Sequence, residues 1–196
     1  MTVIGITGPS GAGKSTALGL LQEMGAYVID CDAVYHALLE TNGLMLEELN
    51  RRFPGVVRAG VLDRKALGAI VFHDSAALQD LSAITHGYVK LEVGRRLEIA
   101  AKEGRALAAV EAIALIESGV ADLCTLVLGV IAPVDLRLQR LMEGEGLSLG
   151  YATARIQSQK PDSFFRKHCD YILENAAANP ETFIEACTDL FRQIAV

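Results

Sequence analysis

The fold is decided by residues 3–16, which read VIGITGPSGAGKST. A short apolar run leads into a glycine-rich segment, where Gly8 is followed after four residues by Gly13, Lys14 and Ser15. This is the spacing of a phosphate-binding P-loop. Residues 17–24 then carry apolar side chains at helical spacing, so the motif has the strand–loop–helix context that it requires. The sequence therefore predicts a nucleotide site here.

Each residue type in this loop has a physical reason. Glycines permit backbone angles and close approach that a Cβ would forbid, and the backbone N–H groups of the loop and helix N-terminus then point at phosphate oxygens. We expect Lys14 to reach the β- and γ-phosphates and the Ser15 hydroxyl to bind Mg²⁺. The residues expected to hold the nucleotide are Gly11, Ala12, Gly13, Lys14, Ser15 and Thr16.

Composition narrows the class of protein. The chain has 196 residues, of which 51% are hydrophobic and 21% charged, which fits one folded domain with room for a small inserted subdomain. Its net charge of −6 argues against nucleic-acid or anionic-membrane partners. An anionic substrate must therefore be met by local cations.

The N-terminus shows no basic region followed by an apolar stretch, so we expect no signal peptide. The longest apolar run, residues 123–134, is too short to span a bilayer. Four cysteines are scattered without CxxC spacing, which indicates reduced, buried thiols in a cytoplasmic protein. They are Cys31, Cys124, Cys169 and Cys187.

Further apolar runs predict four more strands, and with them an α/β fold with a five-stranded parallel sheet. Their ranges are 26–30, 106–112, 125–131 and 171–173. Between the second and third strands we predict helices only: one capped by Asp63, one starting at 74–75, and a longer one from near His86 to Lys102. Residues 136–168 read as a cationic helical hairpin, the place for a lid over phosphates.

Acidic residues follow two of these strands. Asp30 and Asp32 end the second strand, and Glu111 lies near the end of the third. In an open α/β sheet, ligands bind at the carboxyl edge, so the aspartates are candidates for metal positioning and for a base. Alternatively, they only cap the next helix, and Glu111 is only a polar residue at a strand exit.

Several motifs together resemble the dephospho-CoA kinase family over nearly the whole chain. They are residues 5–16, 28–32 (VIDCD), 60–64 (GVLDR), 71–72 (VF), 84–86 (ITH), Glu117, 154–159 (ARIQSQ) and 170–175 (DYILEN). The resemblance implies a three-layer P-loop kinase fold, with a core of residues 1–32, 105–135 and 169–196, a helical acceptor-binding insertion at 33–104 and a lid at 136–168. It also implies ATP-dependent phosphorylation, with Mg²⁺, of the ribose 3′-hydroxyl of dephospho-CoA.

The resemblance assigns roles residue by residue. Asp32 matches the base for the 3′-hydroxyl, and Asp30 matches the aspartate that supports the metal. Arg140 matches a basic residue at the start of the lid, which with Lys14 and Asp32 makes up the expected catalytic set. Asn175 falls near the adenine. The acceptor is expected against Asp32, His86, Glu111 and Glu117.

One departure concerns the lid, where the family carries an Arg-Asp pair and this chain has Gly144-Glu145. Arg137, Arg140 or another lid cation then compensates, or the enzyme is slow. The alternatives are another nucleoside- or nucleotide-type small-molecule kinase, or a nucleotide-binding homologue without transfer activity. The absence of an Asn-Lys-x-Asp stretch argues against a GTPase. We expect a monomer or weak homo-oligomer.

Overall fold

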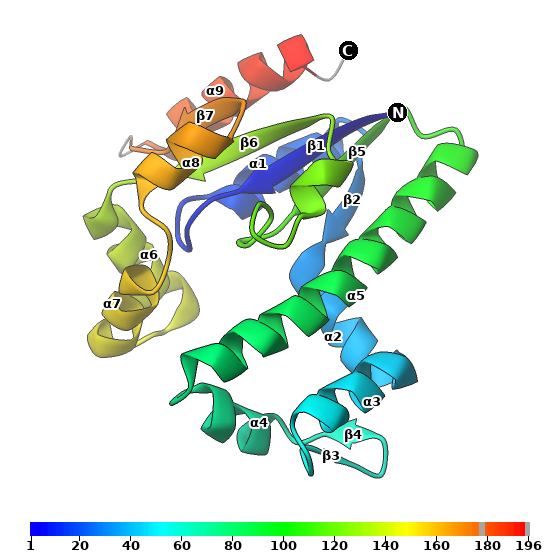
Figure 1. The fold of residues 1–196 in the computed structure, drawn as a ribbon. Helices are drawn as coiled ribbons and strands as arrows, with labels where there is room; N and C mark the ends of the chain where they lie inside the picture. Colours follow the sequence, from blue (N-terminus) through cyan, green and yellow to red (C-terminus); the bar gives the residue numbers. More distant parts are fainter. Residues whose placement is uncertain (177–178, 195–196) are drawn as a thin grey trace.

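The computed structural model describes residues 1–176 and 179–194 and contains a five-stranded parallel sheet (Figure 1). The order is β2-β5-β1-β6-β7, and every neighbouring pair is parallel. The bounds are Thr2–Thr7 (β1), Tyr27–Asp30 (β2), Leu107–Glu111 (β5), Leu126–Ile131 (β6) and Tyr171–Glu174 (β7). The prediction of a five-stranded parallel sheet is confirmed.

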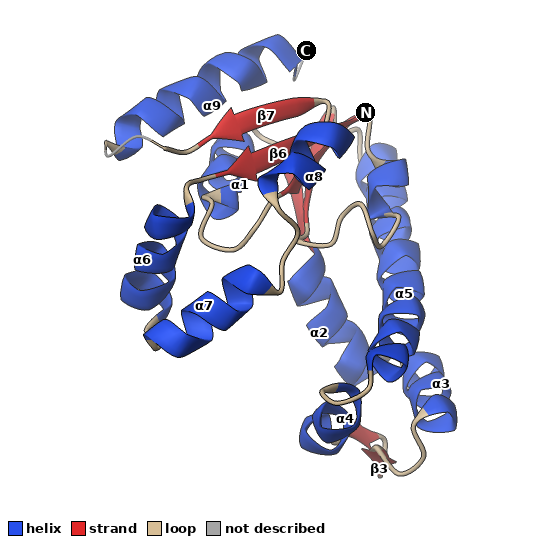
Figure 2. Ribbon diagram, turned by 60° about the vertical axis from the view of Figure 1, so that its left-hand side comes forward, coloured by secondary structure: helices blue, strands red, loops and turns tan. Residues whose placement is uncertain are grey.

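Helices cover both faces of this sheet, which gives three layers (Figure 2). Helices α1 (Lys14–Glu23) and α9 (Pro180–Ile194) pack on one face, and α5 (Ser75–Lys102) packs on the other with the 3₁₀ turn η1 (Val120–Leu123). Alternate strand residues enter the two cores: Val3 belongs to one cluster and its neighbour Ile4 to the other. Burial on both faces explains the continuous apolar runs in the sequence.

The segment between β2 and β5 is mainly helical but includes a short hairpin. Its elements are α2 (Cys31–Thr41), α3 (Gly43–Arg52), β3 (Val57–Arg58), β4 (Val61–Leu62), α4 (Arg64–Val71) and α5. The prediction of helices only was wrong, because β3 and β4 pair antiparallel. Two-residue strands are too short for a periodic signal. The hairpin depends instead on Ala59 and Gly60, both at positive φ (50° and 77°), as a two-residue turn requires.

Helix α5 is one continuous helix of 28 residues, whereas the sequence predicted two. Asp74 caps it by accepting hydrogen bonds from the backbone N–H groups of Ala76 and Ala77. Gly87 weakens helix propensity by about 1 kcal/mol without ending the helix. Buried residues such as Thr85, Val89 and Val93 continue one packed face through it, and this packing outweighs the propensity.

Between β6 and β7 the chain forms α6 (Val134–Glu145), α7 (Leu149–Gln157) and α8 (Asp162–His168). Helix α6 ends at Gly146, which adopts a left-handed conformation, and Ser148 caps α7. Because α6 follows β6 and α2 follows β2, both extend from the carboxyl edge of the sheet (Figures 1 and 2). Within the described ranges, no helix has the length and apolar character to cross a membrane.

Candidate active site

The loop between β1 and α1 is held tightly against the ends of β6 and β7. Gly8 has a φ of 142° and Gly13 a φ of 108°, angles that L side chains rarely adopt. A Cβ on Gly8 would overlap the carbonyl oxygen of Val130, and one on Gly13 would overlap the side-chain nitrogen of Asn175. Both glycines are therefore required by backbone conformation and by space.

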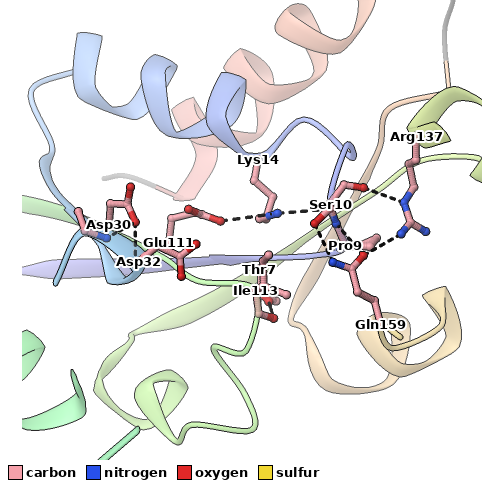
Figure 3. Close-up of polar contacts among 11 residues, drawn as sticks. Thr7, Pro9, Ser10, Lys14, Asp30, Asp32, Glu111, Ile113, Arg137 and Gln159 are labelled. Carbon is pink, nitrogen blue, oxygen red and sulfur yellow. Dashed lines mark hydrogen bonds and ion pairs between the residues drawn. The ribbon is translucent and has the colours of Figure 1, made fainter. Parts of the chain in front are cut away.

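Lys14 begins α1 and points back along the loop (Figure 3). Its ammonium donates to the Pro9 carbonyl at 3.3 Å and lies 3.7 Å from Oε1 of Glu111, which ends β5. Burial lowers the pKa of Lys14, and Glu111 opposes the shift. Burial likewise raises the pKa of Glu111 against the effect of Lys14. Burial thus disfavours the charged form of each group, and the contact between Lys14 and Glu111 partly offsets this effect.

Two residues of the segment 134–168 bind the loop at Ser10, a role that the sequence does not predict for either of them. The buried Arg137 donates from Nε to the Ser10 carbonyl and from Nη2 to Oε1 of Gln159, both at 3.0 Å. Gln159 also accepts from the Ser10 backbone N–H and donates to its hydroxyl, as Figure 3 shows. Burial lowers the pKa of Arg137. Gln159 lies in a motif quoted above, but nothing in that motif predicts a contact 149 residues away.

Arg140 and Asn175, both predicted site residues, meet on the loop. Arg140 donates to the Gly11 carbonyl and to Oδ1 of Asn175, each at 3.1 Å. The Asn175 amide, which is buried, donates to the Ala12 carbonyl at 2.9 Å. These contacts occupy the consecutive carbonyls of Gly11 and Ala12, next to the N-terminus of α1, where backbone N–H groups can bind an anion.

A cavity of about 490 Å³ lies over the loop and collects most of the predicted site residues. It combines cations with two carboxylates from the carboxyl edge of the sheet, as expected for a site that binds polyphosphate and activates a hydroxyl. Its lining includes Ser10, Gly11, Gly13, Lys14, Ser15, Thr16, Asp32, Glu111, Arg140, Glu145, Arg155 and Asn175. Of the expected nucleotide residues, Ala12 is fully buried and does not line it.

Asp30 lies outside this lining. Its carboxylate accepts from the backbone N–H groups of Asp32 and Ala33 and so caps α2, the structural role weighed above. Its strand partner is Glu111. No group of three or more metal-binding side chains occurs in residues 1–176 and 179–194. A Mg²⁺ bound chiefly by phosphate oxygens and water, with Ser15, fits this arrangement because Mg²⁺ needs few protein ligands.

A second cavity of about 230 Å³ adjoins the first. The two share Asp32 and Ile113, and the second is lined further by α2 and α5 through Tyr35, Thr85 and His86. Burial lowers the pKa of His86, whereas nearby Glu117 raises it. Glu117 does not line this cavity. The structure therefore places Asp32 between a charged space and a less polar one.

Comparison with known proteins agrees with this geometry. The family model described as "Dephospho-CoA kinase" matches residues 2–181. The chain belongs to the dephospho-CoA kinase family. A dephospho-CoA kinase of Anaeromyxobacter dehalogenans is 41% identical over 180 residues, 91% of this chain and 85% of the relative. One of Corynebacterium diphtheriae is 35% identical, covering 91% and 90%.

Solved structures agree. The dephospho-CoA kinase from Campylobacter jejuni is 29% identical with a TM-score of 0.70, covering 98% of this chain and 96% of that one. A crystal structure from Thermus thermophilus reaches a TM-score of 0.77 at 34% identity, covering 98% and 97%. A shikimate kinase from Bacteroides thetaiotaomicron shares the fold, with a TM-score of 0.60 at 12% identity. The dephospho-CoA kinase family thus shares its architecture with other small-molecule kinases.

Proposed function

We propose that this protein transfers the γ-phosphoryl group of ATP to the ribose 3′-hydroxyl of dephospho-CoA. The observation that carries the proposal is the position of Asp32 at the junction of two cavities, one lined by the P-loop and its cations, the other by α2 and α5. A phosphoryl donor and a hydroxyl acceptor have to meet at one carboxylate. Membership of the dephospho-CoA kinase family supports the choice of acceptor.

The larger cavity suits the triphosphate of ATP. Lys14 and Arg140 supply positive charge, and the N-terminus of α1 offers backbone N–H donors. Ser15, with the phosphates, would hold Mg²⁺, which neutralises charge on the β- and γ-phosphate oxygens. Catalysis of phosphoryl transfer rests mainly on such positioning and charge neutralisation.

The smaller cavity suits the acceptor. Asp32 would orient the hydroxyl and accept its proton at a carboxylate oxygen, which leaves the oxygen free to attack phosphorus. His86 and Tyr35 would line the acceptor side, while Glu111 holds Lys14 in place. We also assign Glu117 to this side, and the charge effect of Glu117 that raises the pKa of His86 supports the assignment.

The two segments that extend from the carboxyl edge fit two separate tasks. We assign acceptor binding to residues 33–104, which supply the walls of the smaller cavity. We assign closure to residues 136–168, whose arginines reach the loop. Closure over the phosphates would exclude water and limit wasteful hydrolysis of ATP.

The test incubates the protein with Mg-ATP and dephospho-CoA and follows ADP release together with the mass of the acceptor. We expect acceptor-dependent ADP release and a gain of one phosphate. Lys14→Ala should abolish both signals, whereas Lys102→Ala, at the far end of α5, should leave them intact. Absence of phosphorylated product, or faster transfer to another nucleoside or nucleotide in a panel of acceptors, would overturn the proposal.

A further inference from the structure

An ion pair in the segment 134–168 faces the larger cavity. Arg155, in the last turn of α7, donates from Nη1 to the carboxylate of Glu145, the last residue of α6. The two side chains are 45% and 51% exposed. Both line the cavity that also contains Lys14 and Arg140. The pair thus borders the space assigned above to the triphosphate.

Two other arginines of this segment, unlike Arg155, reach the P-loop and are bound to protein groups there. Arg137 is buried and donates to Ser10 and Gln159. Arg140 donates to the Gly11 carbonyl and to Asn175. If either moved to a phosphate, these contacts with the loop would be lost. Arg155 holds no part of the loop, so its guanidinium is free to move without disturbing it.

The energetics favour an exchange of partners at Arg155. An exposed ion pair contributes about 0–1 kcal/mol, so breaking it costs little, and Glu145 is exposed enough to be solvated by water. A guanidinium forms two parallel hydrogen bonds with a phosphate, and a triphosphate carries more charge than one carboxylate. An arginine at the transferred phosphoryl group raises turnover by about 10³-fold or more.

We propose that Arg155 is a catalytic residue of this kinase, which leaves Glu145 and contacts the transferred phosphoryl group when ATP is bound. Glu145 is its counter-ion: it keeps the guanidinium at the edge of the cavity and competes with phosphate for it. This inference rests on the proposed function. It also predicts that removing the charge of Arg155 weakens ATP binding, whereas removing the charge of Glu145 strengthens it.

The test compares Arg155→Gln with Glu145→Gln. The matched controls are Arg166→Gln and Glu174→Gln, which break an ion pair of similar exposure (52% for each side chain) outside the cavity. We expect Arg155→Gln to lower kcat about 100-fold or more, and Glu145→Gln to lower KM for ATP by up to about fivefold, because the competing carboxylate is removed. The control variants should match the wild type.

If the ion pair were only structural, Arg155→Gln and Glu145→Gln would break the same contact and would have similar effects. Equal losses of kcat in Arg155→Gln and Glu145→Gln, or a kcat of Arg155→Gln within about threefold of wild type, would overturn the proposal. Calorimetric titration with ATP alone tests the role of Arg155 independently of the proposed acceptor. Tighter binding to Glu145→Gln and weaker binding to Arg155→Gln would support it even if dephospho-CoA were not the acceptor. Unchanged binding in both variants would overturn it.

Discussion

Gly13 is the position where one added methyl group should disturb the most structure. The residue precedes α1 with a φ of 108°. The space for a Cβ there is filled by the amide nitrogen of Asn175, and Phe183 Cε1 would lie only 3.3 Å away. In Gly13→Ala the asparagine must therefore move, and with it the contacts to Ala12 and Arg140.

The expected cost has two parts. A left-handed conformation costs a residue with a Cβ about 1–2 kcal/mol. Displacing the Asn175 amide leaves a buried polar group without its partner, which costs about 1–3 kcal/mol. We therefore expect Gly13→Ala to lower the free energy of unfolding by about 2–5 kcal/mol, a large part of the stability of a typical domain. ATP binding should also weaken, because Ala12 and Gly11 lose the groups that hold their carbonyls.

Urea denaturation followed by circular dichroism measures the first effect, and calorimetric titration with ATP measures the second. The matched control is Gly19→Ala in the middle of α1, where nothing lies within 4 Å of the added methyl. Alanine is a better helix former than glycine by about 1 kcal/mol, so this variant should be more stable than wild type. If Gly13→Ala unfolded at the urea concentration of wild type, the argument from backbone angle and space would be refuted.

Three further outcomes are expected. Asp32→Asn should lower turnover at least about 100-fold while ATP binding by calorimetry stays near that of wild type; retained turnover would reject Asp32 as the base. Burial raises the pKa of Glu111 in the folded protein above its ordinary value of 4.5. The protonated carboxyl therefore contributes fully to the stability of the folded state below pH 4.5, and this contribution is lost as the pH rises through the raised pKa. Urea midpoints of wild type relative to Glu111→Gln should therefore fall over this range, and a rise would contradict the burial argument. Burial raises the pKa of Cys31 and of Cys187 to about 12, so iodoacetamide at about pH 8 should label them only after unfolding; mass spectrometry showing fast labelling of the folded protein would refute this.

The sequence predicted the sheet well because its signals are local. The central strands β1, β5 and β6 are almost wholly buried and mainly apolar, as burial on both faces requires, and the P-loop spacing fixes where β1 ends and α1 begins. The same reasoning failed for β3 and β4, whose two residues each carry no period. It also divided α5 near His86, where the helix in fact continues because packing of one face outweighs local propensity.

The candidate site was predictable only in part, for a related reason. Lys14, Asp32 and Glu111 follow from the motif and from the rule that ligands bind at the carboxyl edge, and the structure gathers them around one cavity. The contacts that shape the loop come from far away in sequence. Arg137 and Gln159 reach Ser10 across 127 and 149 residues, and no local pattern encodes such a distance.

The arginines of the segment 134–168 differ in burial, and this difference separates their roles. A buried guanidinium loses hydration and needs fixed acceptors, and Arg137 finds them in the Ser10 carbonyl and Gln159. It is therefore a structural part of the loop. Arg155, at 45% exposure with one solvated carboxylate as partner, can change partners at low cost. In the sequence, both are simply arginines on amphipathic helices. The structure separates the arginine that shapes the loop from an exposed arginine that can exchange its partner at low cost. We therefore expect the loss of Arg155, rather than that of Arg137, to lower turnover before it lowers stability.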